Sequence, residues 1–158
     1  MHGAPAPAIW VCLPTYNEAE NLARMVRRIL DVFDGADLDG HVLVIDDDSP
    51  DGTGAIADEI ARDDARVAVL HRPERQGLGP AYRDGFRVVL ARGADLIIEM
   101  DCDFSHDPAA IPLLVEAAGH ADVVLGSRYV PGGAIENWGA IRRIISRGGC
   151  EYARLALG

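Results

Sequence analysis

The sequence predicts an α/β fold in which a mainly parallel sheet carries helices on both faces. Two observations support this prediction. Short, mostly apolar runs alternate along the chain with segments in which apolar residues recur at helical spacing. Strands without polar alternation are typical of a sheet covered on both sides, and helices between such strands are typical of parallel crossovers.

Five apolar runs are expected to form the strands. In chain order they are Ile9–Leu13, His41–Ile45, Val67–Leu70, Leu96–Met100 and Val123–Leu125. Four helices are expected between them, each beginning where the sequence offers a suitable first turn. The first covers roughly residues 19–33, the second runs from a cap at Asp51 or Thr53 to about Arg62, the third has Pro80 in its first turn and runs to about Arg92, and the fourth follows the pair Asp107-Pro108.

Composition and charge narrow the possible functions. The chain has 158 residues, of which 49% are hydrophobic and 25% charged, as expected for one globular domain. The net charge of -10 argues against a nucleic-acid partner, because phosphates would be repelled. The charge is uneven: residues 1–127 carry 10 Arg and 23 acidic residues, whereas residues 128–158 carry 5 Arg and 2 acidic residues. No Lys is present, and no apolar run approaches the roughly 20 residues that span a bilayer.

Polar residues follow four of the expected strands. These segments are Pro14–Glu18, Asp46–Thr53, Asp101–Pro108 and Gly126–Tyr129. In open α/β sheets, ligands bind beyond the carboxyl ends of the strands. We therefore expect a functional site at this edge of the sheet.

Asp101 and Asp103 flank a single residue at the end of the fourth expected strand. If the turn directs both carboxylates to one side, they form a hard-oxygen site for Mg²⁺ or Mn²⁺, with open positions for a diphosphate. Ser105 could add an oxygen, directly or through water. The alternative is a solvated turn.

A second acidic group follows the second expected strand. Asp48 and Asp51 fit a turn that leads into a helix, whereas Asp46 ends the strand directly. A carboxylate at that point can accept hydrogen bonds from the N–H groups of a nucleobase, so Asp46 is the candidate ligand of this group.

Other candidates have two interpretations each. Tyr16 offers a flat face to a base or ribose, and Glu18 either accepts from a nucleotide or lies at the start of a helix. Arg128 could bind phosphate oxygens or pair with the acidic edge. Arg142 and Ser146 lie one helical turn apart, beside an apolar stripe, and could hold a second phosphate or form a solvated basic face.

His106 is a general-base candidate or a structural residue. The segment around Gly77 is expected to be a tight turn into the third helix.

These motifs resemble a known family. The segments PTYNE, DDDSPDGT, RQGLGPAY, DCDFSHDP, GSRY and RRIISRG occur in the order found in dolichol- or polyprenol-phosphate mannose synthases. Those enzymes are inverting family 2 glycosyltransferases with the Rossmann-like GT-A fold. The resemblance covers nearly the whole chain, from about Ile9 to Gly149.

The resemblance implies a role for each matching residue. The guanosine would be held by Pro14, Tyr16, Glu18, Val44 and Asp46. Asp101 and Asp103 would coordinate the metal beside the nucleotide, with Cys102 contributing its backbone and Ser105 standing where the family often has Gln. Arg128, Arg142 and Ser146 would gather the donor and acceptor phosphates and, with Asp103, make up the expected catalytic set.

The implied reaction is metal-dependent transfer of mannose from GDP-mannose to a polyprenyl monophosphate, with inversion. An acceptor phosphate is already ionised near neutral pH, so no general base is required, and positioning and charge stabilisation suffice. Further implied partners are the cytoplasmic face of a membrane and a separate membrane-anchor subunit or domain.

Family members continue past the point where this sequence ends. The resemblance therefore implies one catalytic domain over residues 1–158 that is incomplete at its C-terminus. The alternatives are a related enzyme with another sugar nucleotide or acceptor, and an inactive nucleotide-binding fragment. A phosphoreceiver domain is disfavoured because its phosphate-pairing Lys is missing from this chain.

Overall fold

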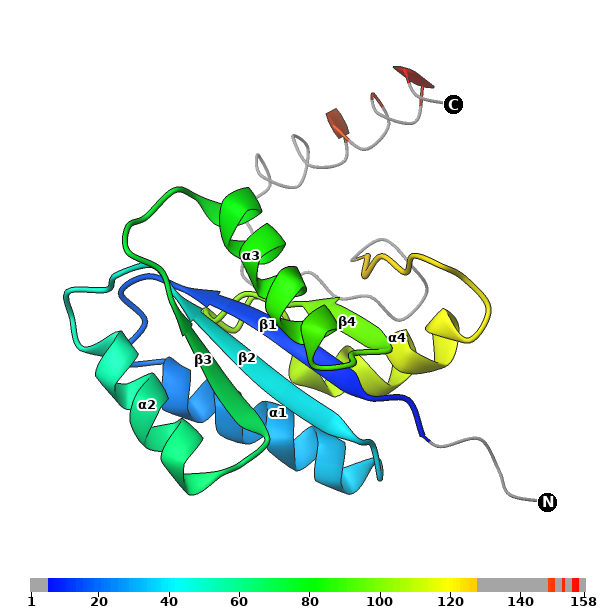
Figure 1. The fold of residues 1–158 in the computed structure, drawn as a ribbon. Helices are drawn as coiled ribbons and strands as arrows, with labels where there is room; N and C mark the ends of the chain where they lie inside the picture. The colour runs from blue at the N-terminus through cyan, green and yellow to red at the C-terminus, as the bar shows by residue number, and fades with distance from the viewer. Residues whose placement is uncertain (1–5, 128–147, 150–151, 153–154, 157–158) are drawn as a thin grey trace. The chain divides into compact units, whose positions relative to one another are not determined.

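The computed structural model describes residues 6–127, 148–149, 152 and 155–156. By its internal contacts the chain divides into two compact units, Met1–Asp122 and Val123–Gly158. The first unit contains all the regular elements that follow (Figure 1). They are β1 (Ile9–Thr15), α1 (Leu22–Gly35), β2 (Gly40–Asp46), α2 (Thr53–Asp63), β3 (Val67–His71), α3 (Leu78–Ala91), β4 (Leu96–Glu99), the short 3-10 helix η1 (Pro108–Ala110) and α4 (Ile111–Ala118).

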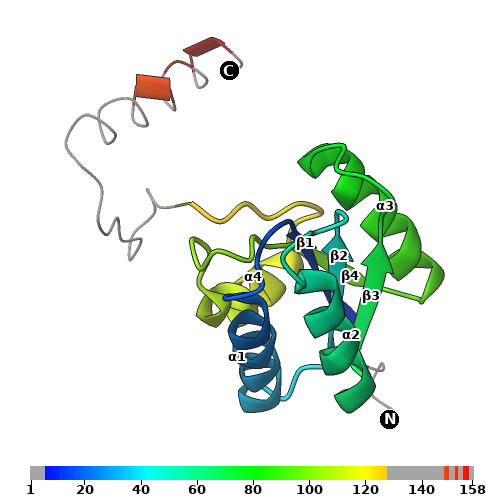
Figure 2. The same ribbon diagram turned by 90° about the vertical axis from the view of Figure 1, so that its left-hand side faces the viewer.

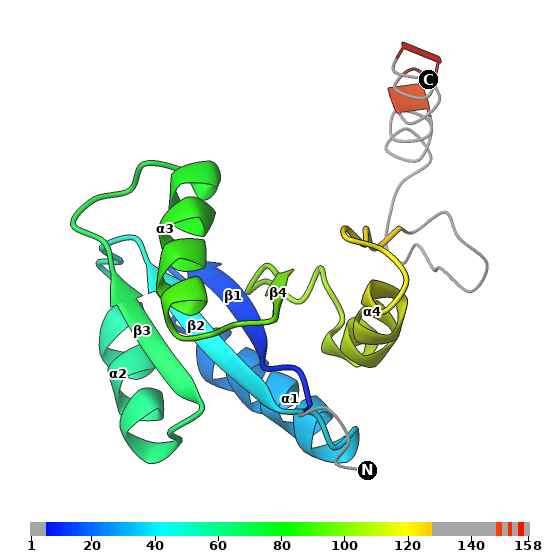
Figure 3. The same ribbon diagram turned by 45° about the vertical axis from the view of Figure 1, so that its right-hand side comes forward.

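The four strands form one parallel sheet in the order β3-β2-β1-β4. Figure 3 shows β1 and β2 in the middle, with β3 and β4 at the two edges. Because every strand runs the same way, all four carboxyl ends lie at one edge of the sheet, which we call the rim. The predicted α/β fold with a parallel sheet is confirmed.

Helices cover both faces of the sheet because successive side chains of a strand point to opposite sides. Ile9, Val11 and Leu13 of β1 pack in a core with the buried residues of α1 and with Ala57 of α2. Trp10 and Cys12 pack in a second core with α3. Figures 1 and 2 show this arrangement, with α1 and α2 on one face and α3 on the other.

Helix α1 is the main cover of the first core. Its buried residues are spaced three and four apart, as the sequence predicted: Leu22, Met25, Val26, Ile29, Leu30 and Phe33. Full burial of each large side chain contributes about 1.5–3 kcal/mol before entropy is subtracted. Two of the predicted first turns are observed, since Asp107 accepts a hydrogen bond from the Ala109 N–H at the start of η1, and Pro80 lies in the first turn of α3. The predicted cap of α2 at Asp51 or Thr53 is wrong, because the N-cap residue is Gly52 with a φ of 92°.

The prediction of a fifth strand is wrong. Val123–Leu125 is not a strand, and Val123 and Leu125 are 75% and 84% exposed. A run of three residues has few backbone groups to pair and little surface to bury, so it becomes a strand only when a neighbour pairs with it.

Parts of the predicted C-terminal stripe can also be located. Tyr152 and Leu155 are helical and are 74% and 85% exposed, whereas residues 141–147 lie outside the described part of the chain. Among the helices that the structure describes, none has the length and apolar character needed to cross a bilayer.

Packing at the start of β2 gives a testable prediction. A Cβ added at Gly40 would overlap the ring of Phe33, which is fully buried. Gly40→Ala should therefore lower the free energy of unfolding by about 1–3 kcal/mol, measured by urea denaturation. Gly35→Ala is the matched control, because a Cβ there meets open space. Equal stability of the Gly40→Ala variant and the wild type would contradict this packing.

Candidate active site

Three loops at the rim share an unusual backbone feature. Asn17 after β1, Asp48 after β2 and Phe104 after β4 have φ angles of 60°, 56° and 61°. Asn and Asp tolerate this left-handed conformation, whereas for Phe it costs roughly 1–2 kcal/mol. Each loop therefore turns sharply just beyond its strand.

The loop after β2 holds the loop after β1 in place. Three successive backbone N–H groups of the β1 loop donate to side chains of the β2 loop. Asn17 donates to Ser49 Oγ at 3.1 Å, Glu18 to Thr53 Oγ1 at 2.9 Å, and Ala19 to Asp51 Oδ2 at 3.1 Å. The PTYNE and DDDSPDGT segments thus form one structural unit, with Thr53 completely buried at its centre.

Asp51 organises this unit. Its Oδ1 accepts hydrogen bonds from the hydroxyl of Thr53 at 2.6 Å and from the Thr53 N–H at 3.0 Å. The hydroxyl bond is the main cause of a lowered pKa for Asp51. The predicted role of Asp51 in a turn that leads into a helix is confirmed.

Asp46, the last residue of β2, is buried and incompletely satisfied. Its Oδ2 lies 3.4 Å from the Ser49 N–H nitrogen and 3.8 Å from Nδ1 of His71. Its Oδ1 is, among the described residues, the buried side-chain polar atom that lacks a hydrogen-bond partner. Buried polar atoms are almost always paired. Asp46 therefore stays a candidate to accept a hydrogen bond from a ligand, although it is not one of the residues that line the pocket described below.

The loop after β4 is closed by hydrogen bonds around Asp103. Oδ1 of Asp103 accepts from the Ser105 N–H at 2.8 Å. Burial opposes ionisation of Asp103, but the hydrogen bonds from Ser105 outweigh it and lower its pKa. His106 accepts from the Asp101 N–H through Nδ1 at 3.1 Å, which favours the structural interpretation of His106.

Phe104 anchors this loop to the first core. Its ring packs against the core residues, and the guanidinium of Arg24 on α1 lies 5.1 Å from the ring centroid. Arg28 on the same helix lies 3.8 Å from Asp107. Helix α1 thus supports the segment that carries Asp101 and Asp103.

Asp101 and Asp103 provide carboxylate oxygens that suit a hard divalent ion. Within the residues that the structure describes, no cluster of three or more His, Cys, Asp or Glu side chains is arranged to hold a metal. Mg²⁺ commonly binds through one or two carboxylates and takes its other ligands from water and substrate phosphates. Asp101 and Asp103 therefore stay candidates for holding such an ion.

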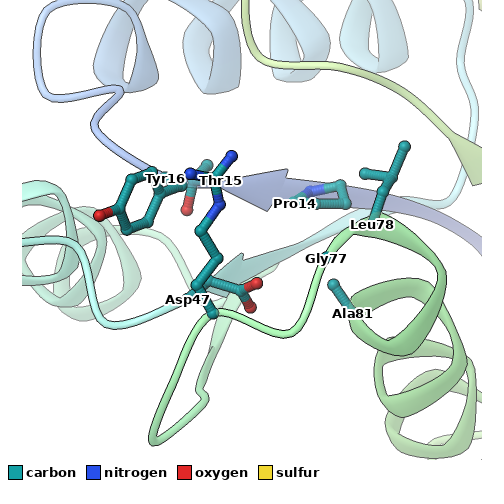
Figure 4. Close-up of a pocket in the computed structure, with 8 residues that line it drawn as sticks. Pro14, Thr15, Tyr16, Asp47, Gly77, Leu78 and Ala81 are labelled. Atoms are coloured by element: carbon teal, nitrogen blue, oxygen red, sulfur yellow. The ribbon is translucent and has the colours of Figure 1, made fainter.

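A pocket of about 130 Å³ lies at the rim between the end of β1 and the start of α3 (Figure 4). This is close to the roughly 150 Å³ cavity that holds a benzene ring, so it has the size for a planar ring. The Tyr16 ring lies 4.2 Å from the guanidinium of Arg75. The lining residues are Pro14, Thr15, Tyr16, Asp47, Arg75, Gly77, Leu78 and Ala81.

The remaining predicted site residues are distributed as follows. Val44 is completely buried in the first core, which argues against contact of its side chain with a ligand. Cys102 is also buried, and burial raises the pKa of its thiol to about 12, so only its backbone is available.

The carboxylate of Glu18 accepts a hydrogen bond from the Asn21 side chain, which leaves both interpretations of Glu18 open. Three predicted residues lie outside the described part of the chain: Arg128, Arg142 and Ser146.

Sequence reasoning missed the contribution of the segment between β3 and α3. The sequence marked this segment by the RQGLGPAY motif and by the expected turn at Gly77, which is confirmed by a φ of 94°. Asp47, Arg72 and Arg75 were not singled out. Two arginines directly after a predicted strand were the available signal, because that position is also at the rim.

Comparison with known proteins assigns the family. The family model described as "Glycosyl transferase family 2" matches residues 10–156. The chain belongs to glycosyl transferase family 2. The sequence-based resemblance to this family is therefore confirmed.

This family 2 chain is similar over nearly all of its length to two curated relatives. It is 50% identical over 92% of its length to an undecaprenyl-phosphate mannosyltransferase of Micrococcus luteus, and 46% identical over 98% of its length to a polyprenol monophosphomannose synthase of Mycolicibacterium smegmatis. It spans 58% and 57% of these two relatives, respectively.

A solved structure shares the fold. The mannosyltransferase PcManGT of Pyrobaculum calidifontis, in complex with GDP-Man and Mn²⁺, has a TM-score of 0.54 and 25% identity to this chain. The match covers 62% of this chain and 28% of that protein.

The hydrogen bond between Thr53 and the Glu18 N–H gives a prediction for stability. Thr53→Val keeps the shape of the side chain but removes the acceptor, so the N–H is left unpaired in a part-buried position. We expect a loss of about 1–3 kcal/mol in the free energy of unfolding, measured in urea. Ser49→Ala is the control and should cost about 0.5 kcal/mol or less, because water can replace the hydroxyl beside the exposed Asn17. Equal effects of the two variants would contradict the central role of Thr53.

Asp51 gives a prediction for pH dependence. Its pKa is lowered in the folded state, so its ionised form stabilises the fold above the unfolded pKa of about 3.9, and this contribution is lost as the pH falls through the folded pKa. The stability difference between the wild type and Asp51→Asn should therefore shrink as the pH is lowered below about 4. Urea denaturation at a series of pH values measures it. A difference that stays constant with pH would contradict this assignment.

Proposed function

We propose that this family 2 glycosyltransferase transfers mannose from GDP-mannose to the phosphate of a polyprenyl monophosphate. The observation that carries the proposal is the 50% and 46% identity to two relatives that are named as an undecaprenyl-phosphate mannosyltransferase and a polyprenol monophosphomannose synthase. The buried, unpaired oxygen of Asp46 at the rim supports a nucleotide site in this chain.

In this proposal the rim binds the donor. Asp46 accepts hydrogen bonds from the base, and Tyr16 and Pro14 form one wall of the pocket beside it. Glu18 completes the proposed nucleoside site, and Val44 would act only indirectly, because its side chain is buried and its backbone is paired within the sheet between β1 and β3. Asp101 and Asp103, with Ser105 beside Asp103, would hold Mg²⁺ or Mn²⁺, and Cys102 would offer its backbone. A Mn²⁺ ion in the solved PcManGT complex supports this choice of metal.

The chemistry is a single displacement at the anomeric carbon. A phosphate oxygen of the acceptor forms the new bond to this carbon, and the bond to the diphosphate oxygen breaks, so the electron pair leaves with GDP. A divalent cation, when bound, would stabilise the charge on the GDP leaving group. Arg128, Arg142 and Ser146 would bind the phosphates, because two anions brought close together without cations repel each other by several kcal/mol even at an effective dielectric of about 20.

The acceptor also sets the proposed location. A polyprenyl phosphate lies in a membrane with its phosphate at the surface, so the enzyme would work at the cytoplasmic face as a peripheral protein. A membrane-anchor subunit or domain would be a further partner. The basic balance of residues 128–158 supports contact with anionic headgroups.

Ligand-dependent melting tests the choice of donor. GDP and GDP-mannose with Mn²⁺ should raise the melting temperature, and UDP-glucose should raise it less. Asp46→Asn should weaken GDP binding, since the amide replaces one acceptor oxygen by a donor. The absence of a preference for the guanine nucleotides would contradict the proposal.

Transfer of labelled mannose to a polyprenyl phosphate tests the reaction. Asp103→Asn should reduce the rate by about 10²–10³-fold, the scale expected on loss of one electrostatic stabiliser. Asp37→Asn is the matched control: Asp37 is exposed in the turn before β2, at the end of the sheet opposite the rim, and its left-handed φ of 53° suits Asn. Equal rates for the two variants would overturn the assigned role of Asp103.

A further inference from the structure

Arg72 is a buried cation at the rim that the proposed reaction does not use. It directly follows β3, and its side chain is 5% exposed. Its guanidinium forms ion pairs with Asp47 and with Asp84 of α3, the latter at 3.1 Å, and donates to Gln76 Oε1 at 3.3 Å. The hydrogen bond to Asp47 is the main cause of its raised pKa.

The charges around Arg72 balance. Asp47, whose side chain is 8% exposed, pairs with Arg72, and Asp84 pairs with both Arg72 and Arg87, the latter at 3.0 Å. A buried carboxylate without such a partner would carry a large desolvation penalty. The charges of these two arginines and two aspartates therefore cancel one another, and Arg75, which also lines the pocket, adds a positive charge.

This cancellation affects the pocket directly. Asp47 lines the pocket, together with Pro14, Thr15 and Tyr16 of β1. Figure 4 shows Asp47 at the side of the pocket formed by the strand ends. A nucleoside diphosphate is anionic, so a free carboxylate in this wall would repel it. Paired with Arg72, Asp47 contributes little net charge.

Arg72 also fixes the opposite wall. Its backbone N–H donates to the carbonyl oxygen of Asp46 at 2.8 Å, and its guanidinium reaches Gln76 near the other end of the loop between β3 and α3. Arg75 within this loop lies over the ring of Tyr16. One side chain thus ties both ends of the loop to the end of β2.

We propose that Arg72 is a positioning residue that adapts the pocket to an anionic nucleotide. It cancels the charge of Asp47 in one wall and holds the loop that forms the other. The inference rests on the proposed function in one respect, namely that the rim binds GDP.

A charged and a neutral ligand of the same base separate this role from a merely structural one. Binding of GDP and of guanosine is measured by calorimetry for the wild type, Asp47→Asn, Arg72→Met and the double variant Asp47→Asn/Arg72→Met. Arg72→Met leaves Asp47 unpaired, so the affinity for GDP relative to guanosine should fall about threefold to tenfold. Asp47→Asn leaves an excess positive charge, so the same ratio should rise by a similar factor. The double variant should return close to the wild-type ratio.

Arg83→Met is the matched control, because it removes an arginine from an exposed position on α3. It should leave the ratio unchanged. If Arg72→Met does not fold because of the unpaired carboxylate, the other two variants still make different predictions: the ratio should rise in Asp47→Asn and should stay close to the wild-type value in the double variant. A ratio that is the same in all folded variants overturns the role of Arg72, whereas a wild type that binds neither GDP nor guanosine overturns the proposed function instead.

Discussion

Parallel pairing of β1 with both β2 and β4 is the constraint on which the rest of the structure depends. It places the carboxyl ends of these strands at one edge, so that residues far apart in the sequence meet there. Because β4 ends opposite Cys12, the last residues of β1 have β2 alone beside them. Pro14 has no backbone N–H, and it costs the sheet no hydrogen bond because it lies beyond the point where β4 has ended. The end of β1 is therefore free to line the pocket.

The rim is held together mainly by side chains that accept from backbone N–H groups. Ser49, Asp51 and Thr53 hold the loop after β1, and Asp103 and His106 accept within the loop after β4. Such bonds fix a loop without a regular ladder, and those made by carboxylates are charge-assisted and stronger. The concentration of acids at this edge thus has a structural cause as well as a functional one. In this arrangement Asp46 differs from the others, since one of its oxygens is buried without a hydrogen-bond partner.

Local patterns predicted the fold well and the site in part. Strands β1–β4 and helices α1–α4 were expected close to their observed bounds, because apolar spacing and first-turn residues are properties of short segments. The failure at Val123–Leu125 has the opposite cause, since a short strand depends on a neighbour that a local pattern cannot supply. Likewise, the sequence marked Asp46 by its place after an apolar strand, but it could not reveal that Asp47 pairs with Arg72, 25 positions further along. The roles of Arg128, Arg142 and Ser146 stay predictions.

The left-handed backbone of Phe104 links the packing of its own ring in the core to the position of the neighbouring Asp103 at the rim. A glycine would adopt this φ without cost, so the phenylalanine is kept there by the burial of its ring against the α1 side of the core. The position of Asp103 beside it is therefore set by how well a hydrophobic contact is maintained, and not only by the turn itself. Sequence changes on α1 that loosen this contact, although remote from any substrate, would alter how the carboxylate is presented. The placement of the Asp103 carboxylate at the rim therefore also depends on the packing of the first helix.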